Sequence, residues 1–163
     1  MPFGETLLPE FEQEMAITRR VLERVPGEKG QWKPHPKSFA LGHLAQLVSW
    51  MPGWISQTLK EPVLDLGKGG GYSFETTERL LQTFDANVAA TRAALTETPD
   101  NAWSATWTLK HGANTLWSAP RNVVVRNHLN HLIHHRAQLT VYLRLLDVPV
   151  PSTYGPSADE RTF

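Results

Sequence analysis

Helical periodicity in four long stretches is the feature that most restricts how this chain can fold. The stretches run over about 6–25, 39–60, 73–98 and 118–147. In each of them apolar residues recur three and four positions apart, which places them on one face of an α-helix. Pro26-Gly27 ends the first stretch and Pro99 ends the third. The chain has 163 residues and no internal repeat, so the pattern predicts one all-α domain, a four-helix bundle over residues 1–163.

The segment between the third and fourth stretches departs from the helical period. Apolar residues alternate along it, at Trp103, Ala105, Trp107 and Leu109. Lys110-His111-Gly112 can turn the chain, and Trp117 could lie on a returning strand. A short hairpin over about 103–117 is therefore expected, docked on the bundle by its tryptophans.

Two helix caps and one loop complete the expected architecture. Ser38 and Ser73 are the predicted N-caps of the second and third helices. The glycine-rich segment 61–72 lacks the spacing of a phosphate-binding loop, and no strand is expected before it. It is therefore interpreted as a flexible loop.

Composition excludes several classes of function. Sixteen basic residues balance sixteen acidic ones, so charge gives no argument for binding nucleic acid or an anionic membrane. No run reaches the roughly 18 apolar residues of a membrane span, and the N-terminus does not resemble a signal peptide. A cytoplasmic location is therefore expected. Cys is absent, so a metal would have to be held by His, carboxylate or water.

Histidines are concentrated in the middle of the last predicted helix. His128, His131, His134 and His135 lie within eight positions. Each residue turns an α-helix by about 100°, so His135 lies about 40° from His131 and one turn further along. Both are expected to point into the bundle beside the apolar stripe of this helix.

This spacing favours a metal site, although a simpler interpretation also accounts for it. Imidazoles four positions apart can converge on one cation, as in the HExxH zinc helix, whose Glu this chain lacks. A surface or core histidine pair without metal is the alternative. His128 and His134 are expected to be solvated or hydrogen-bonded rather than ligating. A third ligand would have to come from another helix, where His43 is the candidate, with a partly buried edge residue as its alternative role.

Three segments resemble the DinB/YfiT-like family of proteins. They are Trp32-Lys-Pro-His-Pro-Lys-Ser38, Leu41-Gly-His-Leu-Ala45 and Asn130-His-Leu-Ile-His-His-Arg-Ala-Gln138. The resemblance implies an up-down-down-up helix order, a homodimer, and a site of three histidines that holds zinc or nickel. His131 and His135 match two of these ligands. The third aligns with Leu47, and His43 lies one turn away on the same face, from which it could reach the metal.

The resemblance also implies a possible enzymatic activity, because some relatives are transferases or isomerases that use a low-molecular-weight thiol. Such a thiol would attack a small electrophile, and the absence of Cys is consistent with a cofactor that brings the sulfur. Arg136 could anchor the thiol's carboxylate or form an interhelix salt bridge. Gln138 could orient a ligating histidine, Tyr142 could act as an acid or pack, and His128 could assist at the site. The alternatives are a non-catalytic metal-binding or stress-related protein with an incomplete site, and a helical interaction module without metal.

Overall fold

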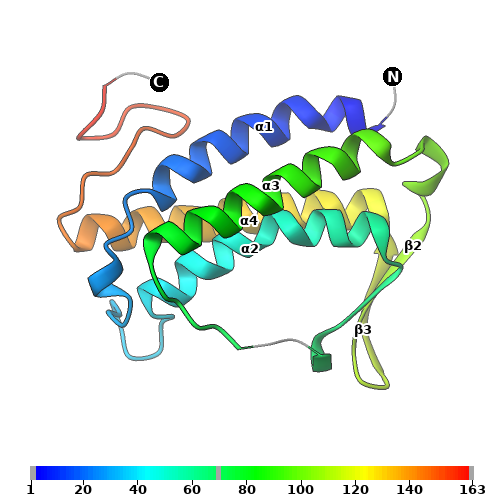
Figure 1. Ribbon diagram of the computed structural model, residues 1–163, viewed down its shortest axis with the longest axis horizontal. Helices are drawn as coiled ribbons and strands as arrows, with labels where there is room; N and C mark the ends of the chain where they lie inside the picture. Colours follow the sequence, from blue (N-terminus) through cyan, green and yellow to red (C-terminus); the bar gives the residue numbers. More distant parts are fainter. Residues whose placement is uncertain (1–2, 69–70, 162–163) are drawn as a thin grey trace.

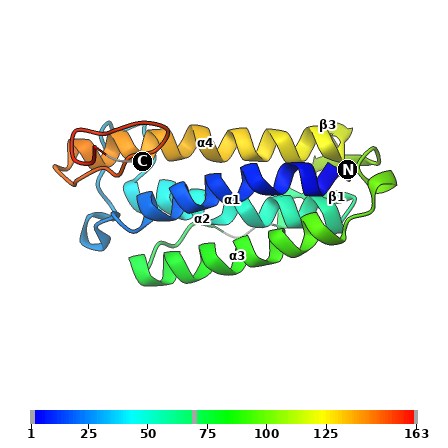
Figure 2. The ribbon, with the colours of Figure 1, turned by 90° about the horizontal axis from the view of Figure 1, so that it is seen from above.

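The computed structural model describes residues 3–68 and 71–161, and helices dominate this part of the chain (Figure 1). Its long helices are α1 (Phe3–Leu22), α2 (Leu41–Lys60), α3 (Thr77–Glu97) and α4 (Arg121–Leu145). They lie side by side, with α1 and α2 each packed against both α3 and α4 (Figure 2). In Figure 1, α1 and α4 run from right to left, whereas α2 and α3 run from left to right. Within the described residues, no helix is both long and apolar enough to cross a membrane.

A small mixed sheet lies at the end of the bundle where α1 and α4 begin (Figure 1). Its strands in the described residues are β1 (Val63–Asp65), β2 (Thr106–His111) and β3 (Asn114–Pro120), in that order across the sheet. β1 pairs with β2 in parallel, and β2 pairs with β3 as an antiparallel hairpin. Gly112 has a φ of +59° at the hairpin turn, a conformation that costs glycine little.

The sheet shows that the all-α class predicted from the sequence is wrong. The hairpin expected between the third and fourth helices is present, but β1 lies in the segment that was interpreted as a flexible loop. Three residues are too few to show a strand period. β1 forms because β2 offers it a partner, with Val63 opposite Thr108. Residues 69 and 70 of the glycine-rich segment lie outside the described residues.

Three helix starts also differ from the sequence-based expectation. α2 begins at Leu41 behind Ala40, which has no polar side chain, so Ser38 is not its cap. α3 begins after Thr76, whose hydroxyl accepts a hydrogen bond from the Arg79 backbone N–H at 3.1 Å. Ser73 therefore precedes the helix without capping it. α4 begins at Arg121 because the residues before it belong to β3.

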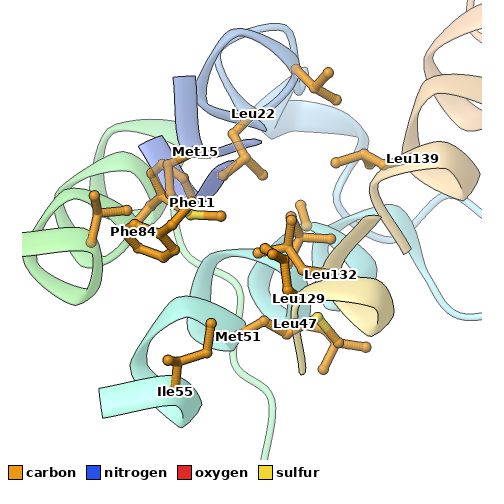
Figure 3. Close-up of a cluster of buried hydrophobic side chains, with 14 of the residues drawn as sticks. Phe11, Met15, Leu22, Leu47, Met51, Ile55, Phe84, Leu129, Leu132 and Leu139 are labelled. Atoms are coloured by element: carbon orange, nitrogen blue, oxygen red, sulfur yellow. The ribbon is translucent and has the colours of Figure 1, made fainter. Parts of the chain in front are cut away.

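The hydrophobic core runs along the axis between the helices and determines which face of α4 is buried. Figure 3 shows side chains from all the helices meeting there, among them Phe11, Met15, Leu47, Met51, Phe84, Leu129, Leu132 and Leu139. Along α4, the buried apolar residues that belong to this core cluster are Val125, Leu129, Leu132, Leu139 and Leu143. They are spaced three or four apart except between Leu132 and Leu139, where Arg136 occupies the intervening core position.

Candidate metal centre

The rings of His131 and His135 face each other across one turn of α4. Their Nε2 atoms are 2.9 Å apart, and their ring centroids are 4.7 Å apart. His135 Nδ1 lies 2.7 Å from Gln138 Oε1. An amide oxygen only accepts hydrogen bonds, so His135 Nδ1 carries the proton and donates it to Gln138. This tautomer leaves a lone pair on His135 Nε2, directed toward His131, as a metal ligand requires.

The prediction that both rings point into the core is wrong. His131 is exposed and His135 is half-buried. The face of α4 that is buried in the core carries Leu132, Arg136 and Leu139. His131 and His135 each precede one of these buried residues by one position. Such a position is turned by about 100° from the core. The pair therefore lies at the edge of the helix bundle, where a ligand from solution can reach it.

The surroundings of the pair favour neutral imidazoles. Burial lowers the pKa of His131, and His135 and His134 lower it further. Burial also lowers the pKa of His135, partly offset by the hydrogen bond to Gln138, while His134 contributes a smaller lowering. Metals bind the neutral form of histidine, so these shifts extend the ligating form to lower pH.

The spacing of the two nitrogens fits a shared cation. If each nitrogen were about 2.05 Å from the cation, a separation of 2.9 Å would correspond to an angle of about 90° at the metal. Neighbouring ligands in square-planar or octahedral coordination subtend this angle. Widening the distance between the two Nε2 atoms to roughly 3.3 Å would give the tetrahedral angle that zinc prefers. The distance between His131 Nε2 and His135 Nε2 is therefore compatible with both nitrogens binding one divalent transition metal.

In the part of the chain that the structure describes, no third protein ligand joins this pair. Leu47, at the position suggested by the resemblance, is buried in the core and offers no donor atom. His43 is stacked between Phe39 and Tyr72, with centroid distances of 4.3 and 3.8 Å. Burial lowers its pKa, with Lys33 adding to the effect. Among residues 3–68 and 71–161, no group of three His, Cys, Asp or Glu is arranged to hold a metal.

The other candidates have structural partners. Arg136 is buried and pairs with Glu14 of α1, with 2.7 Å between Nη1 and Oε2, so it is not placed to anchor a thiol's carboxylate. The Tyr142 hydroxyl donates to the Phe39 carbonyl at 3.3 Å. His128 is buried, with Nε2 lying 3.1 Å from the Thr58 hydroxyl. Exposed His134 contacts the His135 ring edge-on, with centroids 4.9 Å apart.

An aromatic pocket beside His131 was not predicted from the sequence. We call it the tryptophan pocket; it has a volume of about 460 Å³ and lies between α2, α4 and the sheet. Its walls include Trp50, Trp54, Tyr72, Trp107, Trp117 and His128. These residues come from segments far apart in the chain, so no local pattern brings them together. The one available signal was the pair Trp50 and Trp54, one helical turn apart.

Burial of His128 makes the stability of the protein depend on pH. Its pKa is lowered from 6.5 to about 4, mainly by burial and secondarily by His131. As the pH falls below 6.5, the unfolded chain therefore takes up this proton before the folded chain does. We expect this group to lower the free energy of unfolding by about 3 kcal/mol between pH 7 and pH 4.

Urea unfolding at a series of pH values measures this loss. His128→Gln should flatten the profile over this range, whereas His111→Gln, at the exposed hairpin turn, should retain the wild-type profile. A His128→Gln profile that parallels the wild type would contradict the assignment.

Comparison with known proteins places the chain in a family. The model of the DinB family matches residues 1–162, so the chain belongs to the DinB family. Its fold is similar to that of a DinB-like protein from Bacillus cereus ATCC 10987, with a TM-score of 0.73 at 22% identity, covering 92% of this chain and 97% of that one. A DinB-like protein from Bacillus subtilis gives a TM-score of 0.71 at 15% identity, with 97% and 99% covered. No curated protein matches the chain significantly.

Proposed function

We propose that this DinB-family protein binds a divalent transition metal, zinc or nickel, through His131 and His135. The observation that carries the proposal is the 2.9 Å approach of the two Nε2 atoms. Gln138 supports it by holding the proton of His135 on Nδ1. Water or a small molecule supplies the remaining ligands, which is the arrangement of an open rather than a structural site.

Transfer of a low-molecular-weight thiol to an electrophile is the enzymatic activity that we propose for this site. A divalent cation lowers the pKa of a coordinated thiol, so that the thiol is deprotonated at neutral pH. The chain contains no Cys, so the sulfur must come from a cofactor. His131 and His135 hold the cation at the solvent-exposed edge of α4, and Gln138 fixes the orientation of the His135 ring.

A non-catalytic metal-binding role is the second candidate. The buried leucine at position 47 favours it, because two protein ligands hold a cation less firmly than three. Both candidates require the same histidine pair. They differ in whether a thiol and an electrophile react there.

Calorimetric titration of untagged protein with Zn²⁺ and Ni²⁺ tests the metal site. We expect one cation per chain, and a loss of more than tenfold in affinity when either His131 or His135 is replaced by Ala. His134→Ala is the matched control, because it removes an exposed imidazole from the same helix turn, and its affinity should stay within about threefold of the wild type. Equal affinities for wild type, His131→Ala and His135→Ala would refute the site.

Assays of thiol consumption separate the two candidates. Metal-loaded protein is mixed with a panel of low-molecular-weight thiols and monobromobimane, and loss of free thiol is followed. The transferase predicts an acceleration that a chelator and His135→Ala both remove. If metal binds to the pair but no thiol reacts faster, the non-catalytic role holds.

A further inference from the structure

We propose that the tryptophan pocket binds the uncharged aromatic part of a small molecule and so determines which electrophiles this protein accepts. The binding itself requires no metal. Its meaning as substrate selection rests on the proposed function. The inference follows from the accessible apolar surface of the pocket, the charges around it and the position of His131 in its wall.

The walls of the pocket offer accessible apolar surface to a ligand. Trp50, Trp54 and Trp117 line the pocket, and each is only half-buried. Leu64 and Leu109 also line it and are half-buried. A ligand that covers this surface removes it from water, which is favourable. The volume of about 460 Å³ is within the range of small-molecule sites, which span roughly 300–1,000 Å³.

Stacking holds one of the aromatic walls in place. The Tyr72 ring lies between those of His43 and Trp50, with centroid distances of 3.8 and 5.0 Å and interplanar angles of 25° and 21°. Because both neighbours belong to α2, this stack fixes Tyr72 against the helix. Flat aromatic walls interact best with another aromatic ring, stacked or edge-on. The pocket therefore favours an aromatic ligand over a saturated one of similar size.

The charges around the pocket disfavour an ionised ligand. Among the described residues that line it there is no Lys or Arg, so an anion would find no cation there. Asp65 is the acid in the wall, but its Oδ1 already accepts backbone N–H bonds from Gly67 and Gly112, both at 3.0 Å. Lys110 lies 3.8 Å from its other oxygen. Either kind of ion would therefore lose water without gaining a free partner, which is unfavourable.

His131 joins the pocket to the candidate metal centre. It lines the pocket, its ring centroid lies 6.0 Å from that of Trp54, and its Nε2 faces His135. If the proposed function holds, the molecule in the pocket is the electrophile, and uncharged aromatic electrophiles are the substrate class. The thiol sulfur then forms a bond to a carbon of this molecule. The bond from that carbon to its leaving group breaks, the leaving group departs with the electron pair, and the thiol proton is released to solvent.

The first test measures binding to the full chain in the presence of EDTA, so that metal makes no contribution. Calorimetry compares neutral 2-naphthylmethanol with 2-naphthoate, with 2-naphthylmethylammonium and with the saturated analogue decahydro-2-naphthylmethanol. We expect one 2-naphthylmethanol per chain, bound at least fivefold more tightly than either ion and at least threefold more tightly than the saturated analogue.

NMR of the wild-type protein shows where the probe binds. On addition of 2-naphthylmethanol, the indole signals of Trp54 and Trp117 should shift, because both residues line the pocket. Those of Trp32 and Trp103, which lie outside its described lining, should not. Shifts confined to Trp32 and Trp103 would overturn the inference.

A change of charge in the wall tests the discrimination against anions. Leu66 lines the pocket and is 49% exposed, so Leu66→Lys places a cation at the wall without disturbing the core. This variant should bind 2-naphthoate at least fivefold more tightly than the wild type. Leu116→Lys is the matched control, because Leu116 is 55% exposed and lies outside the described lining. Its affinity for 2-naphthoate should stay within twofold of the wild type, and an equal gain in both variants would contradict the assignment.

The position of the ligand beside the pair is tested with nickel. One equivalent of paramagnetic Ni²⁺ in place of diamagnetic Zn²⁺ should speed the relaxation of the protons of bound 2-naphthylmethanol. In His135→Ala this enhancement should be lost while 2-naphthylmethanol still binds. A chain that binds both nickel and the probe without any enhancement would overturn the inference.

The inference also fails if 2-naphthylmethanol does not bind, if either ion binds most tightly, or if the saturated analogue binds equally well. Failure of these arms with zinc still bound by His131 and His135 leaves the proposed metal site intact. Absence of metal binding, with 2-naphthylmethanol bound in EDTA, refutes the proposed function and leaves the aromatic site.

Discussion

Replacing Arg136 by Met lowers the free energy of unfolding by about 3–5 kcal/mol, the largest stability effect that we expect in this protein. Arg136 lies on the buried face of α4 with 2% of its surface exposed, and its partner Glu14 is 6% exposed. The Glu14 carboxylate would remain buried without its cation, which is the costly half of breaking such a pair. Urea unfolding followed by circular dichroism measures the change.

The surrounding hydrogen bonds add to this expectation. Arg136 also donates to the Thr18 hydroxyl at 3.1 Å and to the Tyr154 hydroxyl at 2.8 Å. Tyr154 in turn donates to the Glu14 carboxylate at 2.8 Å, which ties the C-terminal segment to α1. The double variant Glu14→Gln/Arg136→Met should recover part of the loss, because no buried charge is left unpaired.

An exposed ion pair provides the control. Arg92 and Glu12 join α3 to α1 at the surface, so Arg92→Met should cost less than about 1 kcal/mol. An Arg136→Met variant within 1 kcal/mol of the wild type would show that this network contributes little.

Replacing Leu47 by His strengthens binding of zinc by at least tenfold, the largest change in affinity that we expect from one substitution. The substitution supplies a third imidazole at the position that the family resemblance assigns to a ligand. Three protein ligands are the usual complement of an open zinc site. The metal-free variant should be less stable than the wild type, because a polar group replaces a buried leucine.

Calorimetry with zinc measures the gain, and Leu47→Gln controls for polarity without an imidazole. Zinc should also raise the melting temperature of Leu47→His more than that of the wild type, because tighter binding to the folded state stabilises it further. An affinity for zinc equal to that of Leu47→Gln would contradict the expectation that an imidazole at position 47 acts as the third ligand.

The helices could be predicted from the sequence because their pattern is local. Periodic apolar residues and proline breaks located all four stretches, and alternation located the hairpin. β1 could not be predicted, because three residues become a strand only when β2 pairs with them. The helix starts also differed from the prediction, since α2 begins behind Ala40 without a side-chain cap and Thr76 rather than Ser73 caps α3.

The site was predicted less completely. Spacing was sufficient to bring His131 and His135 together, because four residues make one helical turn. The burial of these two was overestimated, because Arg136 occupies the core position that an apolar residue would normally mark. An arginine interrupting an apolar line was the signal for a buried ion pair, but its partner Glu14 lies 122 residues away. The tryptophan pocket needed the same long-range information.

Anomalous X-ray scattering from crystals of untagged protein grown with zinc tests the metal site most directly. Data collected on both sides of the zinc absorption edge locate the cation without reference to activity. We predict one strong peak within about 2.3 Å of both His131 Nε2 and His135 Nε2. A peak at other side chains with none between these two rings would contradict the account.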